Sequence, residues 1–160
     1  MSDVPVPMNN KPTVSEFDPD ELLYRRVLPE HFVDGFLIAA HFSFPEPTSE
    51  TGGPSFTRSK FCTPDHITHP NCGGSEPRSQ WRILQCNASA VPTPISSDDG
   101  RVFEFEPKHV PKQTCYAHAE VWCSCVGASS SGPELPPKNV RKKFRVQLSK
   151  VLSEVQQPAH

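Results

Sequence analysis

The chain lacks a long apolar run, and none of its 160 residues belongs to a stretch that could cross a bilayer as a helix. Residues 1–5 have neither the basic start nor the apolar stretch of a secretory signal. Both absences predict a cytoplasmic protein with no membrane partner. In that reducing compartment, we expect the cysteines to be thiols or metal ligands rather than disulfides.

The chain also lacks a strong charge of one sign. Its 16 basic and 18 acidic side chains give a formal charge of -2, which excludes a chain-wide electrostatic footprint for nucleic acid. The charge is uneven, however, because the N-terminal segment through Glu21 is acidic. Residues 138–150 carry six cations: Lys138, Arg141, Lys142, Lys143, Arg145 and Lys150. Such a pattern is typical of a solvated helix face. We therefore expect a protein partner. Binding to nucleic acid through the basic segment remains an alternative.

Common enzyme signatures are absent as well. The sequence contains no Gly-x-Ser-x-Gly elbow, no phosphate-binding loop and no Gly-x-Gly-x-x-Gly motif. Hydrophobic residues make up only 35%, glycine is scarce at 8 residues, and the 19 prolines lie mainly between apolar runs. We expect one compact domain with long loops and no cofactor.

Hydrophobic periodicity predicts several strands followed by one helix. The expected strands are 22–27, 36–44, 55–62, 80–90, 101–106 and 115–123, although residues 18–21 could equally open a short helix. The helical stripe consists of Val140, Phe144, Leu148, Val151, Leu152 and Val155. These elements predict a single α+β domain over residues 18–155: a mainly antiparallel sheet of about five to seven strands covered by one C-terminal amphipathic helix. Residues 1–17 and 156–160 are expected to be flexible tails.

Small apolar residues alternate with polar or aromatic ones most clearly in the segment 115–123. Its small apolar residues are predicted to face inward: Cys115, Ala117, Ala119, Val121 and Cys123. Its chemically capable residues are predicted to face outward: Tyr116, His118, Glu120 and Trp122. The outward row is the main candidate for a working surface.

His118 and Glu120 also match the first half of a zinc deaminase motif. The second half requires a downstream pair of cysteines, and no cysteine follows Cys125. The motif's His should moreover open a helix, whereas the alternation here predicts a strand. The match therefore favours a polar strand face over a deaminase site.

A second candidate is the array Cys62, His66, His69 and Cys72, which could in principle close a tetrahedral zinc site. Cys123 and Cys125 could supply other thiolates. The spacing fits no common zinc knuckle, and two prolines restrict the loop. The alternative is that Cys62 ends a strand and both histidines are solvated, so we expect no bound metal.

Three functional hypotheses remain. The first is a non-catalytic interaction module, one component of a multi-protein bacterial system, which docks through Trp122, Tyr116 and His118. The second is a small hydrolase or transferase that uses Tyr116, His118 and Glu120 with Arg25 or Arg26 for acid–base work or anion binding. The third and weakest is a structural zinc protein.

The order of several short motifs also shows one resemblance. The order Leu23-Tyr24-Arg25-Arg26-Val27, then residues 101–111, then Ala117-His118-Ala119 and a basic segment resembles a loose family of small bacterial proteins. The resemblance covers residues 22–145. No activity is known to us for that family, so it implies no site residue.

Overall fold

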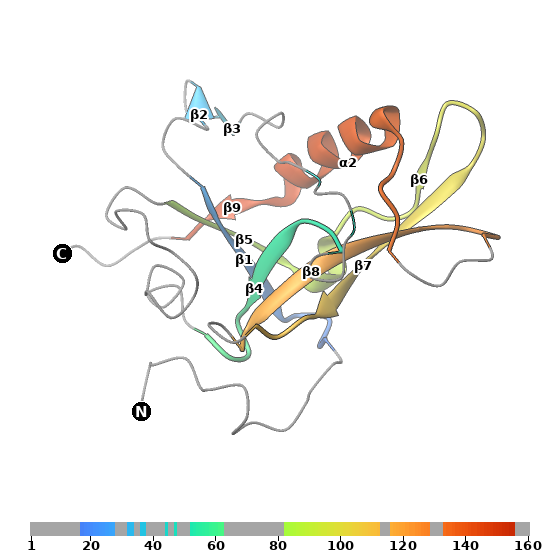
Figure 1. Cartoon of the computed structure of the whole chain (residues 1–160). Coiled ribbons are helices and arrows are strands. Elements are labelled where there is room, and N and C mark those ends of the chain that lie inside the picture. Colours follow the sequence, from blue (N-terminus) through green and yellow to red (C-terminus); the bar gives the residue numbers. More distant parts are fainter. Residues whose placement is uncertain are drawn as a thin grey trace.

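One antiparallel sheet and one helix form the main body of the described chain (Figure 1). The computed structural model describes residues 17–27, 32–33, 36–37, 44, 47, 52–62, 82–112, 116–128 and 133–155. The predicted α+β class is therefore confirmed. Of the two predicted tails, only Phe17 falls within the described residues. Among those residues, no helix is long and apolar enough to cross a membrane.

The sheet has seven strands in the order β6-β7-β8-β4-β1-β5-β9, and each paired neighbour is antiparallel. The strands are β1 (Leu22–Val27), β4 (Ser55–Arg58), β5 (Arg82–Asn87), β6 (Ile95–Ser96), β7 (Val102–His109), β8 (His118–Cys125) and β9 (Ser153–Glu154). A separate hairpin consists of β2 (Phe32–Val33) and β3 (Phe36–Leu37). A short 3-10 helix, η6 (Ala88–Ala90), follows β5.

The predicted strands differ from the observed ones mainly at their ends. Within the expected strand 36–44, only Phe36 and Leu37 are described as strand, and residues 38–43 lie outside the described chain. The expected strand 55–62 stops at Arg58, where a turn begins, while β7 extends beyond residue 106 to His109.

Helix α2 (Lys138–Val151) covers one side of the sheet. Its residues Val140, Phe144 and Leu148 are all completely buried. The Phe144 ring stacks on Phe105 with 4.3 Å between ring centroids. Beneath the helix lie apolar residues that alternate along the strands: Leu23, Val27, Phe56, Leu84, Cys86, Phe103, Val121 and Cys123. This side of the sheet is called the helix side below.

The predicted helical stripe is correct for Phe144 and Leu148 but wrong for Val151, which is 40% exposed. The helix ends at Val151, and Leu152 already has an extended backbone. The next two residues form β9, which pairs with β5. Val155 consequently packs beside a second cluster that contains Tyr24, Cys62, Ile83 and Ala117. Hydrogen bonding to the sheet edge thus replaces the last predicted helical turn.

Candidate functional site

The predicted outward row of β8 is covered rather than open. His118 begins the strand and Glu120 and Trp122 follow it on one face, as the alternation predicts. Glu120 is only 1% exposed, however, and Tyr116 lies in the preceding turn and is 3% exposed. The prediction that this row forms an exposed surface is therefore wrong for Glu120 and Tyr116, whereas His118 and Trp122 are partly exposed.

The cover comes from the segment 52–54, which lies against β8. Glu120 Oε1 accepts hydrogen bonds from the Gly52 backbone N–H at 2.7 Å and from Trp122 Nε1 at 3.0 Å. A Cβ added to Gly53 would lie 1.9 Å from the Val121 carbonyl oxygen, and one added to Gly52 would lie 2.5 Å from Trp122 Nε1. Only residues without a side chain allow so close an approach, so the two glycines cover the Glu120 carboxylate and one side of Trp122.

Tyr116 and Arg25 do not join His118 and Glu120. The Tyr116 ring packs edge-on against Phe61 at 4.9 Å and against His109 at 5.0 Å. Arg25 donates from Nη1 to the Ser55 carbonyl at 2.8 Å and lies 5.7 Å from the centre of the Phe56 ring, on the helix side. With Arg25, the predicted catalytic constellation is therefore split between the two sides of the sheet. Arg26, the alternative, follows Tyr24 by two residues in β1 and lies on the face of Thr57 and His118.

His118 and Glu120 do lie together. His118 Nδ1 is 3.9 Å from Glu120 Oε2, and Lys112 Nζ is equally 3.9 Å from that oxygen. Among the described residues, Glu120 Oε2 has no hydrogen-bond partner. A buried carboxylate thus faces two groups that carry or can acquire positive charge.

Ser55 is the neighbour of His118 that sequence reasoning missed. Its Oγ lies 3.2 Å from His118 Nε2, while His118 Nδ1 lies 2.8 Å from the Val110 carbonyl oxygen. Burial is the main cause that lowers the pKa of His118 from 6.5, and the Lys112 charge adds to it, against the Val110 hydrogen bond and Glu120, which raise it. Ser55 precedes His118 by 63 residues, and no local motif marks it.

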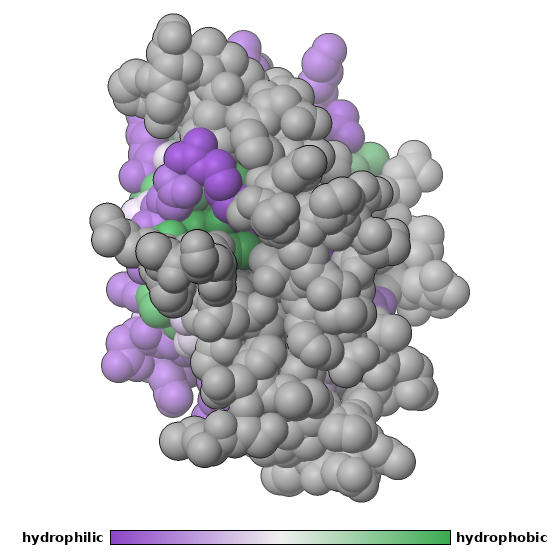
Figure 2. Space-filling model, turned by 90° about the vertical axis from the view of Figure 1, so that its left-hand side faces the viewer, coloured by the Kyte–Doolittle hydropathy of each residue, from purple (hydrophilic) through white to green (hydrophobic). Residues whose placement is uncertain are grey.

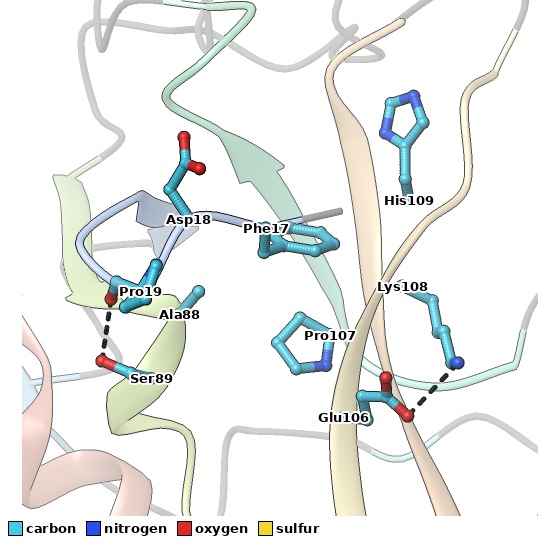
Figure 3. A pocket seen from close by; sticks show the side chains of 9 residues that line it. All are labelled: Phe17, Asp18, Pro19, Ala88, Ser89, Glu106, Pro107, Lys108 and His109. Carbon is cyan, nitrogen blue, oxygen red and sulfur yellow. Dashed lines mark hydrogen bonds and ion pairs between the residues drawn. The ribbon is translucent and has the colours of Figure 1, made fainter. Parts of the chain in front are cut away.

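A cavity of about 640 Å³ opens at another part of the sheet (Figure 3). Phe17, Pro19, Ala88 and Ser89 line one side, and residues 106–109 of β7 line the other. An ion pair between Lys108 and Glu106, with 3.2 Å between Nζ and Oε2, lies at this wall. The lining mixes apolar and charged groups of both signs, so it favours no single ligand class.

Three of the four residues in the candidate metal array lie outside the described chain. Cys62 is buried in the second cluster, whereas His66, His69 and Cys72 lie outside the described chain. Within the described residues, no group of three or more potential ligands comes together. Burial raises the pKa of Cys86 to about 11 and that of Cys123 to about 12, so both are protonated thiols at neutral pH.

The outer face of α2 carries several lysines. A groove of about 560 Å³ runs along it, lined by Asp98, Asn139, Lys142, Lys143, Val146, Gln147 and Lys150. Lys143 is already engaged, because its Nζ lies 3.0 Å from Asp98 Oδ1 and 2.8 Å from the Ser96 carbonyl. Val146 is 39% exposed between the remaining lysines.

The side of the molecule that lies on the left of Figure 1 is a further candidate docking surface. Where described residues reach the surface there, hydrophobic atoms form small areas bordered by hydrophilic ones (Figure 2). In its described part, this side therefore has no broad apolar face for docking.

Comparison with known proteins adds no assignment. No family model, no curated protein and no solved structure matches this chain. The resemblance to a loose bacterial family remains a prediction, and the function must be argued from the geometry alone.

Proposed function

We propose that the protein is a cytoplasmic interaction module, one component of a multi-protein bacterial system, and that it docks an acidic polypeptide segment on the outer face of α2. The observation that carries the proposal is the separation of charge. Helix α2 holds six basic and no acidic residues, which leaves 10 basic and 18 acidic side chains elsewhere, a formal charge of -8. A cationic helix on an otherwise acidic chain attracts acidic partners to that helix.

The groove also has the geometry for a particular kind of peptide. Lys142, Val146 and Lys150 are spaced by four residues, so they lie on one ridge with about 6 Å between successive positions. In an extended peptide, alternate side chains lie on one face with nearly the same spacing of about 6.5 Å. A Glu-x-Leu-x-Glu segment therefore matches the ridge, with leucine on Val146 and a carboxylate at each lysine.

The described contacts leave this ridge available. Lys142, Val146 and Lys150 are all exposed, and no ion pair of either lysine occurs within the described residues. Trp122 and Tyr116 are less available for docking, because Tyr116 is buried and the Trp122 indole N–H donates to Glu120.

The test measures binding of fluorescent Glu-x-Leu-x-Glu peptides by anisotropy. We expect binding that weakens with added salt, and weaker binding when glutamine replaces both glutamates or serine replaces leucine. The Lys142→Ala, Lys150→Ala double variant should lose about 2- to 30-fold in affinity, because each exposed ion pair contributes about 0.2–1 kcal/mol.

Lys138→Ala is the matched control, since it removes one cation from the same helix outside the groove. It should change peptide affinity much less than either groove lysine. If Lys138→Ala reduces peptide affinity as much as removal of a groove lysine does, the peptide is attracted by net charge alone, which would contradict the proposal. Tighter binding of a single-stranded RNA than of the peptide, lost in the same double variant, would assign the face to nucleic acid instead.

A further inference from the structure

Ser55 and His118 belong to adjacent strands that place their side chains on one face. The β4–β8 register sets Ser55 opposite Glu120 and Thr57 opposite His118. Because directly paired residues point to the same side of a sheet, all four side chains share that face, away from the helix side. Ser55 is exposed to solvent, whereas the His118 side chain is only 17% exposed.

The hydrogen bonds define the tautomer of His118. A backbone carbonyl can only accept, so the 2.8 Å contact with the Val110 oxygen places the proton on Nδ1. In the neutral ring Nε2 then carries a lone pair, and the Ser55 hydroxyl donates to it at 3.2 Å. This is the arrangement of a nucleophile with its base, in which a third group orients the base.

We propose that Ser55 is a nucleophile, that His118 is its general base, and that the pair accepts acyl groups from small carboxylic esters that reach it from solvent. Ser55 Oγ bonds to the ester carbonyl carbon as its proton passes to His118 Nε2. The bond to the alcohol oxygen then breaks, and Nε2 returns the proton to that oxygen. Water releases the acid from Ser55 by the same two proton transfers.

Glu120 acts on this chemistry as a positioning residue. Its Oε2 lies 3.9 Å from His118 Nδ1, too far for a hydrogen bond but close enough to stabilise the transient imidazolium. Lys112, at the same distance from Oε2, moderates that effect. The lowered pKa of His118 keeps the ring neutral at neutral pH, so Nε2 is able to accept a proton.

The experiment uses p-nitrophenyl acetate, with release of p-nitrophenol and mass spectrometry of the labelled peptide as readouts. We expect one acetyl group on Ser55. The rate should be constant at neutral pH and fall in acid as His118 becomes protonated. Ser55→Ala should abolish that label. His118→Asn should lower its rate roughly 100-fold or more, because general-base catalysis contributes about that much.

His118→Asn is chosen because its amide can still donate to the Val110 carbonyl and thus preserve the local fold. Thr57→Ala is the matched control, since it removes another hydroxyl from the same face, on the residue paired with His118. It should leave the acetylation of Ser55 unchanged. Glu120→Gln should move the acid limb of the rate profile to lower pH, which a merely structural role would not do.

Three outcomes would overturn the proposal: no acetyl group on Ser55, equal acetylation of Ser55 in His118→Asn, or equal loss in Thr57→Ala. Thermal denaturation of each variant identifies any loss that is due to unfolding. If a variant unfolds, the pH profile of the wild-type protein is the remaining test. A wild-type acetylation rate that does not fall at acidic pH would show that His118 is not the base.

Discussion

Arg58 and Glu21 form an ion pair that is almost entirely removed from water. Their side chains are 0% and 3% exposed, and they make two hydrogen bonds of 2.6 Å and 2.8 Å. The Phe17 ring lies 3.9 Å from the guanidinium and covers it. The pair therefore joins the residue before β1 to the end of β4 in a low-dielectric setting.

We predict that Glu21→Gln lowers the free energy of unfolding by roughly 3–5 kcal/mol, because it removes the negative charge beside a fully buried guanidinium. Urea denaturation measures the change. Lys60→Ala is the control, because its pair with Asp18 at 3.8 Å is exposed and should contribute less than about 1 kcal/mol. A loss in Glu21→Gln no larger than in the control would contradict the prediction.

His109 is partly buried, and its two ring nitrogens are shielded from solvent without a hydrogen-bond partner among the described residues. Its ring packs against both Phe61 and Tyr116. Burial, followed by the nearby Arg58 charge, lowers the pKa of His109 from 6.5 to about 4; Glu21 opposes this shift and His118 adds to it. The folded protein therefore keeps this imidazole neutral.

The shift predicts an acid-sensitive fold. The unfolded chain takes up a proton near pH 6.5, whereas folded His109 does so only near pH 4, so stability is lost as the pH falls between these values. His109→Phe removes this loss and both unpartnered nitrogens. Its advantage over the wild type in urea denaturation should grow as the pH falls from about 6.5 to about 4, the two ends of that window. A constant difference would refute the assignment.

At the scale of elements, Phe144 connects α2 to the sheet through aromatic contacts. Phe144 stacks on Phe105 and also meets the Phe44 ring edge-on at 5.3 Å. We predict that Phe144→Ala lowers the free energy of unfolding by roughly 3–5 kcal/mol, the usual cost of removing a buried phenylalanine. Val146→Ala, on the exposed side of the same helix, should cost less than about 1 kcal/mol. A similarly small change in Phe144→Ala would show that the helix does not pack as described.

The segment 52–54 shows how a short connection can change the role of a strand. In sequence, Glu120 belongs to a polar row on an alternating strand, which is typical of an exposed face. In the structure, the Gly52 N–H from 68 residues earlier reaches its carboxylate. Glu120 is consequently buried, whereas Ser55 is exposed and His118 and Trp122 are partly exposed.

At the scale of the whole molecule, the described chain separates its two proposed activities. The cationic ridge lies on the outer face of α2, while Ser55 and His118 lie on the opposite side of the sheet from that helix. Variants in one site should therefore leave the other unaffected, since contacts between them pass only through the core.

Much of the architecture could be predicted from local patterns. The period of two in residues 115–123 and the period of four from Val140 to Leu148 follow from backbone geometry alone. They correctly predicted an antiparallel sheet with one C-terminal helix. The end of α2 could not be predicted in this way, because Val151 and Val155 continue the apolar stripe while pairing of β9 with β5 terminates the helix.

Local sequence is enough to specify which neighbouring side chains share a face and how charge is distributed along the chain. Which residues of a face are covered depends on contacts with segments far away in sequence. Gly52 seals Glu120, Ser55 meets His118, and Phe61 buries Tyr116. Alternation along a strand specifies the face to which a side chain points, but not the residues that contact it. Burial and hydrogen-bond partners are set only when the strands pair and the loops pack against them.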